Sequence, residues 1–489
     1  KGDLQYEEAK KKIVEEIIKE RISSMSTIPL LEAALKMGYE VTPTLISDER
    51  AEYSKGFNRH YTIGAGKGSE IIYSVSSSRD SKIAKEIQRD KWSSNLMIQR
   101  LGLPIPRWQV IDSVSDIKKI WSKFEKPVVI KPTGLTGGKG VSTGINTLEQ
   151  AKKAFDWAYK STDKHEGSPW QRKIMIQEQV SGEDYRLLIV DGKLEIATKR
   201  IPAFIVGDGV NTIEELINKT NSDPKRDVMN PSHTLKPIKI DKPLLDFLKE
   251  QGLTLKYVPQ KDERVVVRKV ASMSQGGITE DYTDKVCPEI KHMVESIAQS
   301  IHAFVIGADV LCKDISKPLT KDNGGILEIN TMPEAYLNLF PVIGESRQYV
   351  AETFVEKLLK NNHTKKIVAI GQFSQDLPTL LKQKTIFGSY IGESSTIGEY
   401  QEGEIRINGL DINKDVPKLE AIYGLKINAS LDAIIINHRD VKDVEEYGFG
   451  FDRVDLLITN RKNRSDKAFM KTIRKYKWKG YINKIKYID

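Results

Sequence analysis

A glycine-rich loop between two apolar strands constrains this chain more than any other feature. Residues 126–143 read KPVVIKPTGLTGGKGVST, so an apolar strand ends at Lys131 and a second strand follows the loop. Glycines let a backbone approach a triphosphate closely and point its N–H groups at the oxygens, while a lysine adds fixed positive charge. A Walker A loop is excluded, because Gly138-Lys139-Gly140 runs into a strand and not into a helix. The pattern indicates a phosphate cradle, and a hairpin turn is the alternative when the loop is taken alone.

A second group of polar residues centres on the predicted strand GGILEIN (324–330). Glu328 and Asn330 alternate along it and therefore share one face, and Asp309 can join them from a neighbouring strand at 304–312. Two carboxylates and an amide oxygen are hard ligands of the kind that magnesium takes together with substrate phosphates. The pattern predicts a magnesium site, and a solvated face is the alternative.

A third group lies where a strand passes into a turn, in QEQVSGEDYR (177–186). Such a hinge exposes backbone N–H and C=O groups that can pair with the edge of an adenine, with a carboxylate nearby for the ribose hydroxyls. By itself the segment is an ordinary loop.

Taken in order and spacing, these groups resemble ATP-grasp enzymes, and more closely the ATP-grasp part of cyanophycin synthetases. The resemblance covers residues 26–350. The segments that carry it are RDKW, VVIKPTGLTGGKGVSTGI, QEQVSGEDYRLLIVDGKLEIATKRIPAFIVGDGVNTIEELI, QGLTLKYVP, SQGGITEDYTD and GADVLCKDI with GGILEINTMPE.

The resemblance implies a role for each matched residue. Those expected to bind ATP are Lys91, Lys131, Gly134, Gly137, Gly138, Lys139, Gly140, Glu178, Val180 and Asp184, with Glu178 and Val180 at the adenine hinge and Asp184 at the ribose. Those expected to hold magnesium are Asp309, Glu328 and Asn330. Those expected to be catalytic are Arg186, Arg268 and Lys131, and those expected to line the acceptor site are Ser274, Gly276, Gly277 and Arg200.

The implied activity is that of an ATP-dependent carboxylate-amine ligase, with ATP and Mg²⁺ as cofactors and amino acids or peptides as substrates. A carboxylate would attack the γ-phosphate, and an amine would then displace phosphate from the acyl phosphate through an oxyanion. One departure concerns the acceptor or phosphate contacts, because Ser272 stands where the related motif favours asparagine.

The last part of the chain departs further from cyanophycin synthetases. Residues 395–412 and 447–460 resemble segments of Mur ligases, but the strand KIVAIGQF (366–373) is followed by SQDLPTLL and not by a P-loop. We therefore expect a multidomain α+β and α/β protein. It would have an N-terminal helix and small α/β region at 1–90, an ATP-grasp catalytic domain at 91–360, and a degenerate, catalytically inactive Mur-ligase-like domain at 365–489. A single ATP site favours one kind of addition over the alternating additions of a two-site synthetase.

Composition narrows the remaining possibilities. No apolar run is long enough to cross a membrane, and the charged start has no apolar signal core, so we expect a cytoplasmic protein. The two cysteines, Cys287 and Cys312, fit a reducing compartment. By analogy with the family, a dimer or tetramer is expected.

The net charge of +9 is concentrated at the end of the chain, where aromatics are interleaved with lysines. A solvated terminal helix and strand is the favoured interpretation, and nucleic acid is not expected as a partner. The alternatives to a ligase are a non-catalytic nucleotide-binding regulator or scaffold, and a nucleic-acid-associated protein that uses this basic tail.

Overall fold

The computed structural model describes most of the chain in nine stretches. They are residues 25–44, 60–135, 138–162, 172–228, 234–331, 333–360, 363–371, 376–383 and 390–488. The N-terminal helix, which the spacing of Ile13, Ile17, Ile18 and Ile22 predicts at 5–22, lies outside the described residues, and so does Gly137. Two compact units emerge: residues 79–350 form the first, and residues 25–78 together with 351–488 form the second.

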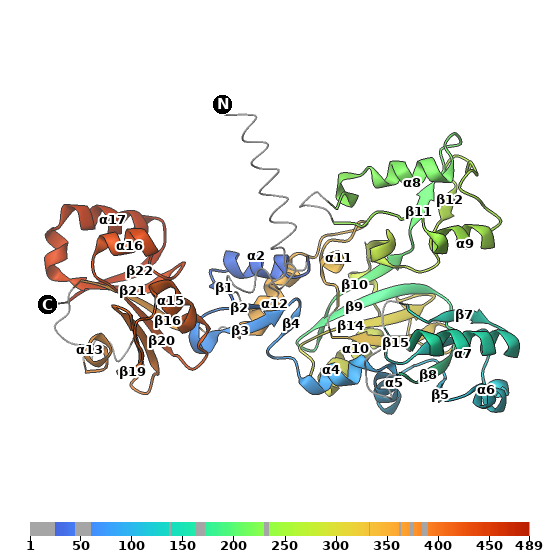
Figure 1. The fold of residues 1–489 in the computed structure, drawn as a ribbon, viewed down its shortest axis with the longest axis horizontal. Coiled ribbons are helices and arrows are strands. Elements are labelled where there is room, and N and C mark those ends of the chain that lie inside the picture. Colours follow the sequence, from blue (N-terminus) through green and yellow to red (C-terminus); the bar gives the residue numbers. More distant parts are fainter. Residues whose placement is uncertain are drawn as a thin grey trace. The chain divides into compact units, whose positions relative to one another are not determined.

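The first unit contains a four-stranded antiparallel sheet in the order β5-β8-β6-β7 (Figure 1). Its strands are β5 (Trp108–Ile111), β6 (Val128–Pro132), β7 (Ser142–Ile145) and β8 (Ile174–Glu178). The helices α6 (Val114–Ile120) and α7 (Leu148–Thr162) pack against this sheet. Ile117 on α6 and Ala158 on α7 are fully buried in the same apolar cluster as Ile130 on β6. The glycine-rich loop therefore connects β6 and β7, as the sequence predicts.

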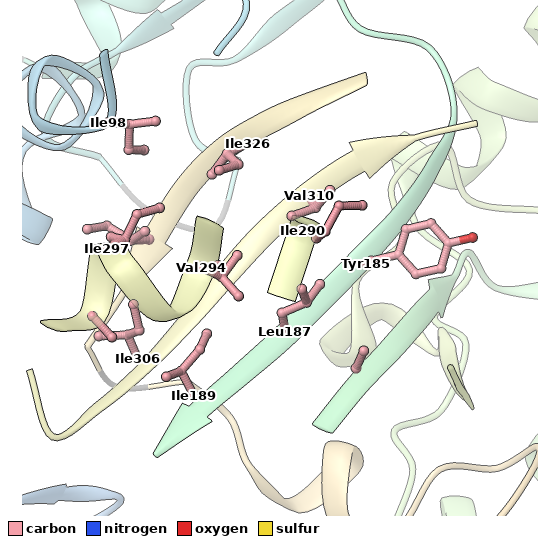
Figure 2. Close-up of a cluster of buried hydrophobic side chains, with 14 of the residues drawn as sticks. Ile98, Tyr185, Leu187, Ile189, Ile290, Val294, Ile297, Ile306, Val310 and Ile326 are labelled. Atoms are coloured by element: carbon pink, nitrogen blue, oxygen red, sulfur yellow. The ribbon is translucent and has the colours of Figure 1, made fainter. Parts of the chain in front are cut away.

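A second sheet in this unit has five antiparallel strands in the order β13-β10-β9-β14-β15. They are β9 (Glu183–Val190), β10 (Lys193–Ile201), β13 (Ile278–Asp281), β14 (Val305–Cys312) and β15 (Gly324–Asn330). Helix α10 (Pro288–Ser300) covers one face with Ile290, Val294 and Ile297, which meet Leu187, Ile189, Ile306, Val310 and Ile326 (Figure 2). Because neighbouring residues of a strand point to opposite faces, Arg186 on β9 and Asp309 on β14 lie on the other face. On β15 a register shift between the Asp309 and Val310 pairings sets Glu328 opposite Asp309, although Ile326 faces α10.

Two segments differ from the sequence expectation. The apolar pattern of residues 185–201 predicts one strand, but the structure has a hairpin of β9 and β10, because Asp191 and Gly192 both adopt positive φ and turn the chain back. The sequence from Ile83 predicts one helix that Gly102 ends, but the structure has two helices there, α4 (Lys82–Arg89) and α5 (Lys91–Arg100). Asp90 separates them, since its extended backbone and its side chain, which accepts a bond from Ser93 N–H, cap α5.

Between β10 and β13 the chain builds a small separate layer. The hairpin β11 (Phe204–Val206) and β12 (Arg264–Val266) packs with α8 (Ile213–Asn221) and α9 (Lys242–Glu250) around an apolar cluster of its own. A capping box starts α8, in which Thr212 and Glu215 each bond the backbone N–H of the other.

The second unit is assembled from both ends of the chain. Its N-terminal part has α2 (Ile28–Lys36) and a four-stranded sheet of β1 (Val41–Pro43), β2 (His60–Ile63), β3 (Glu70–Tyr73) and β4 (Ser76–Ser77). Its C-terminal part has a seven-stranded sheet in the order β19-β18-β17-β20-β16-β21-β22. Those strands are β16 (Lys365–Ile370), β17 (Ile397–Gln401), β18 (Glu404–Ile407), β19 (Leu410–Asn413), β20 (Ala433–His438), β21 (Val454–Asn460) and β22 (Ile482–Ile488).

Five neighbouring strands of that sheet run parallel, from β17 to β22 in the sheet order. The helices that pack on them are α13 (Leu377–Gln383), α15 (Lys418–Ile427), α16 (Val441–Tyr447) and α17 (Lys467–Trp478). Helix α12 (Tyr349–Leu359) precedes β16 in the chain. Alternation of parallel strands and helices gives the α/β character expected here. The likeness to a Mur ligase domain, and the three-domain boundaries drawn from the sequence, stay predictions.

Glu40 joins the two parts of this unit. Its carboxylate, almost fully buried, lies 2.9 Å from Nζ of both Lys366 and Lys426 and accepts a bond from the Asp452 N–H at 2.9 Å. Burial alone would raise the pKa of Glu40, but Lys426 and Lys366 hold it below its ordinary value. The N-terminal strand β1 is therefore tied by ion pairs to the C-terminal sheet.

Candidate active site

The polar face of the five-stranded sheet, opposite α10, gathers most of the charged residues singled out in the sequence. Cross-strand register places Asp309 opposite Arg186 on one side and opposite Glu328 on the other. It also places Asp184 opposite Arg200. The alternation that buries Leu187 and Val310 against α10 thus brings acids and arginines of four strands onto one surface.

Asp309 is the centre of this cluster. Arg186 donates to both of its oxygens, through Nε and through Nη2 at 3.2 Å, and Arg200 donates from Nη2 at 3.1 Å. Burial alone would raise the pKa of the Asp309 carboxyl, but the two guanidinium groups hold it below its usual range. Asp309 is therefore a fixed anion that orients both arginines.

Asp184 occupies the edge of the same cluster. Arg200 donates to its Oδ1 from Nε at 3.1 Å and from Nη2 at 2.5 Å. Burial raises the pKa of Asp184, and Arg200 offsets only part of that effect while Asp309 adds to it. The structure thus places Asp184 beside the arginines, and its role at the ribose stays a prediction.

Glu328 connects the sheet to helix α5. Its Oε2 lies 3.7 Å from Nζ of Lys91, the first residue of α5, and its Oε1 lies 3.5 Å from Nδ2 of Asn330. Glu328 and Asn330 share a face of β15, as the alternation predicts. Lys91 also donates to the Leu135 carbonyl at 2.6 Å, so its ammonium bridges the glycine-rich loop and the acidic strand.

Lys131 is a buried cation on β6. Its Nζ donates to Oε1 of Gln177 on β8 at 2.7 Å, and the residue is 8 % exposed. Burial lowers the pKa of Lys131 to about 8, Glu328 opposes the shift, and Lys91 adds to it. A bound anion would offset the cost of burying this ammonium, so the site suits a phosphate ligand.

The loop after Lys131 needs glycine at two of the positions described. Gly138 and Gly140 have φ of +74° and +72°, a region that side chains disfavour. At Gly140 a Cβ would come within 2.8 Å of Pro132 and 2.9 Å of Ser161. Lys139 between them is exposed, and Gly134 stands at the start of the loop. At Gly140 the absence of a side chain therefore lets the backbone pass close to Pro132 and Ser161.

The predicted hinge follows β8. Glu178 is the last residue of that strand and accepts a bond from the Glu125 N–H at 2.9 Å, while Arg107 Nε lies 3.7 Å from the same oxygen. Its side chain therefore holds the hinge to the segment before β6. Val180 follows at a half-buried position in the turn. Their contacts with an adenine stay a prediction.

Arg268 and the residues around Ser274 lie near the small layer of α8 and α9. Arg268, 2 % exposed, donates to the Lys239 carbonyl at 2.5 Å and has its Nη1 2.8 Å from Asp241 Oδ1. No hydrogen bond or ion pair within the described ranges joins Arg268 to Asp309 or Glu328. Its catalytic role thus stays a prediction.

The expected acceptor segment is a short helical turn between these layers. Ser274 is exposed and shares a hydrogen bond of 2.9 Å with Ser272. Gly276 has φ of +91°, and a Cβ there would lie 2.6 Å from Ile238, so this position accepts glycine alone. Gly277 is equally crowded, because a Cβ there would lie 2.8 Å from the Ile201 carbonyl oxygen. Arg226 holds the turn by donating to the Gly276 carbonyl at 3.1 Å.

Sequence reasoning missed two supporting residues. Gln177 holds Lys131, and Asp90 fixes the first turn of α5 from which Lys91 projects. Asp90 had a readable signal, because an aspartate two residues before Trp92 at a helix start is a typical N-cap. Gln177 had none, since its contact depends on the pairing of β6 with β8.

The donor set fits a magnesium ion with substrate phosphates. Asp309 and Glu328 are cross-strand neighbours, and Asn330 adds an amide group on the same face. Within the described ranges no three His, Cys, Asp or Glu side chains converge as a metal cluster. Magnesium needs few protein ligands when phosphates supply the others, so two carboxylates and an amide are sufficient.

Comparison with known proteins agrees with this geometry. Residues 89–201, which include Lys91, Lys131 and the glycine-rich loop, match the family model of the phosphoribosylglycinamide synthetase ATP-grasp (A) domain. The chain carries an ATP-grasp domain. The α+β multidomain fold class expected from the sequence is thereby confirmed, and the described part of the chain has no helix long and apolar enough to cross a membrane.

Several curated proteins are similar over longer stretches. The cyanophycin synthetase of Crocosphaera subtropica is 31% identical over 393 residues, which cover 78% of this chain and 44% of that protein. The glutathione biosynthesis bifunctional protein GshAB of Clostridium perfringens is 29% identical over 290 residues, which cover 58% of this chain and 36% of that protein. The chain thus spans less than half the length of these curated relatives.

Among solved structures, a bifunctional glutathione synthetase from Pasteurella multocida superposes with a TM-score of 0.52 and 25% identity. The match covers 69% of this chain and 43% of that structure. It supports the ATP-grasp fold of the domain described above.

Proposed function

We propose that this protein is an ATP-dependent carboxylate-amine ligase that forms an amide bond through an acyl phosphate. The observation that carries the proposal is the meeting of two buried or half-buried lysines, Lys91 and Lys131, with Glu328 at the glycine-rich loop of an ATP-grasp domain. The cyanophycin synthetase and the bifunctional glutathione synthetase to which the chain is similar support the class of reaction and favour amino acids or peptides as substrates.

The residues have complementary tasks in such a reaction. Lys131 and Lys91 bind phosphate oxygens of ATP, and the loop from Gly134 to Gly140 closes over them with its backbone N–H groups. Asp309, Glu328 and Asn330 would hold magnesium, which would supply neutralisation of the phosphate charge. Glu178 and Val180 receive the adenine at the hinge.

Arg186 is held toward the reacting face by Asp309 and steadies the γ-phosphate and the carboxylate that attacks it. Arg200 shares that anchor and approaches the acceptor, together with Arg268 and the Ser274 turn. Positioning and charge stabilisation supply most of the catalysis, because phosphoryl transfer of this kind needs no covalent enzyme intermediate. Exclusion of water by the glycine-rich loop protects the acyl phosphate from hydrolysis.

We assign catalysis to the ATP-grasp domain at 91–360 and a non-catalytic role to residues 365–489. The strand β16 is followed by a sequence that lacks the glycines and lysine of a P-loop, so a second phosphate cradle of that type is not built there. One ATP site supports a single kind of addition. A dimer or tetramer is part of the proposal, and light scattering on the purified chain tests it.

The test is release of ADP and phosphate from magnesium-ATP with a panel of amino acids, dipeptides and short peptides. Release that requires a carboxylate and an amine partner together, with the mass of the condensed product in the same tube, supports a ligase. Glu328→Gln should abolish turnover, whereas Glu289→Gln, an exposed substitution on α10, should leave it unchanged. ATP binding with no partner that raises turnover above Glu328→Gln would overturn the proposal in favour of a nucleotide-binding regulator.

A further inference from the structure

The end of the chain carries a charge that the ligase site does not use. Residues 461–489 hold eleven Lys and Arg side chains and two Asp, an excess of nine that equals the net charge of the whole chain. The preceding residues therefore carry equal numbers of basic and acidic side chains. The positive charge of this protein is a local property of its last helix and strand.

Helix α17 sorts these residues by face. A helix turns about 100° per residue, so Lys467, Lys471, Arg474 and Trp478 all lie within about 60° of one another around the axis. Every one of them is exposed. Phe469 and Ile473 lie on the opposite side and are buried in the core of the second unit.

Within the described residues, no acidic side chain pairs with the cations Lys467, Lys471 and Arg474 of the basic face. The nearest acid in sequence, Asp466, is used as the N-cap, because its Oδ1 accepts from the N–H groups of Ala468 and Phe469 at 2.8 and 3.0 Å. A hollow of about 440 Å³ opens on this face, lined by Arg464, Ser465, Asp466, Lys467, Met470, Lys471 and Arg474.

One aromatic side chain, Trp478, extends the basic face at the end of the helix and is 87% exposed. The ring of Tyr481 packs instead against Tyr476, on the opposite side of α17. The Trp478 indole therefore presents a flat apolar surface beside the cations. Its angular position continues the row of cations, at a distance of about 16 Å from Lys467 along the axis.

We propose that this surface, the basic face of α17 with Trp478, binds single-stranded nucleic acid. A row of unpaired cations follows a phosphate backbone, and the exposed ring of Trp478 offers a face on which a base stacks without sequence preference. Insertion of α17 into a membrane is disfavoured, because its apolar face is already buried in the protein. The structure thus favours a partner that the sequence did not lead us to expect.

The cations and Trp478 should contribute to binding in different ways, the cations by contacting phosphates and Trp478 by stacking on a base. One experiment measures the two contributions separately. Neutralising Lys467, Lys471 and Arg474 removes phosphate contacts, so the triple variant to glutamine should lower the slope of log K against log salt by about 2. Trp478→Ala removes a stacking surface and should weaken binding by about fivefold or more with the slope unchanged. Both changes lie on exposed positions of the helix.

The assay is fluorescence anisotropy of the full chain with a labelled oligouridylate of about 20 nucleotides, between about 50 and 200 mM salt. A variant with Lys118, Lys123 and Lys153 changed to glutamine matches the charge change at exposed positions of the first unit and should bind like the original. Duplex RNA of the same length and a polyglutamate chain serve as competing probes.

Tighter binding of the single strand than of either competitor, lost in the triple variant and kept in its matched control, supports the proposal. Equal binding by the triple variant and the original chain overturns it. So does preference for the duplex, which would place the partner among double-stranded nucleic acids, or for polyglutamate, which would indicate an acidic protein. Because Glu328→Gln turnover is measured independently, the outcome does not depend on the ligase proposal.

Discussion

Replacing Lys131 by methionine should stabilise the ligand-free protein. Burial lowers the pKa of Lys131 from about 10.5 to about 8, and each unit of such a shift corresponds to about 1.4 kcal/mol. The charged lysine thus costs the folded state about 3 kcal/mol below pH 8. Methionine removes that cost but leaves Oε1 of Gln177 without its donor, which destabilises the fold by about 1 kcal/mol. The free energy of unfolding should therefore rise by about 2 kcal/mol.

The sign of the pH dependence is a stronger test than the gain itself. A lysine whose folded pKa is lowered releases its proton before the unfolded chain does, so the unfolded state binds more protons between pH 8 and about 10.5. The original protein should therefore gain stability relative to Lys131→Met as the pH rises through that window. Below pH 8 the difference between the two should be constant.

Thermal unfolding of both proteins from pH 7 to pH 10, without nucleotide, measures how their difference in stability depends on pH. At pH 7 the variant should melt roughly 5 °C higher, and its affinity for ATP should fall at least tenfold in calorimetric titrations. Lys153→Met, at an exposed position of α7, is the matched control and should change neither property. A variant that melts lower than the original, or a difference that does not shrink above pH 8, would refute the reasoning that Lys131 is held at a cost for a phosphate ligand.

Substitutions in two other ion-pair clusters should destabilise the protein, in contrast to Lys131→Met. Asp309→Asn leaves Arg186 and Arg200 facing a neutral amide, so we expect the unfolding free energy to fall by about 3 kcal/mol and turnover to be lost. The control Asp156→Asn, at an exposed position of α7, should change neither property. Glu40→Gln should destabilise the second unit by about 2–3 kcal/mol at pH 7, since two lysines lose their shared partner. That difference should disappear in acid, because a carboxylate with a lowered pKa loses its stabilising effect as the pH falls through the folded value. Denaturant unfolding at pH 7 and pH 3, with Glu32→Gln as the exposed control, distinguishes this from a packing defect, which would persist at both pH values.

Local patterns predicted the parts of the site that depend on one strand and its neighbour. The alternation of Glu328 and Asn330 follows from the period of a strand, and the pairing of β14 with β15 sets Asp309 opposite Glu328. The position of the glycine-rich loop between β6 and β7 follows from the apolar runs on either side of it. In these cases the functional residues and the local structure that positions them lie in the same short segment of sequence.

Other relations depend on register over longer distances. The pairing of Asp184 with Arg200 requires the turn at Asp191 and Gly192, which lies inside what the residue pattern presents as one long strand. The bond from Lys131 to Gln177 requires that β6 and β8 be neighbours although α7 separates them in the chain. Hydrophobic periodicity carries no information about which strands pair, so these contacts were not predictable from one sequence.

The ion pairs of Glu40 have a consequence for the order in which the protein is made. Strand β1 leaves the ribosome early, but the lysines that neutralise Glu40 belong to β16 and α15, some 320 to 390 residues further along. At usual rates of synthesis this interval lasts on the order of tens of seconds. During that time the first unit, residues 79–350, has all of its own strands, while the N-terminal sheet still lacks the larger sheet that receives it. A nascent chain halted after residue 350 would accordingly have a protected ATP-grasp unit and an N-terminal segment open to proteases.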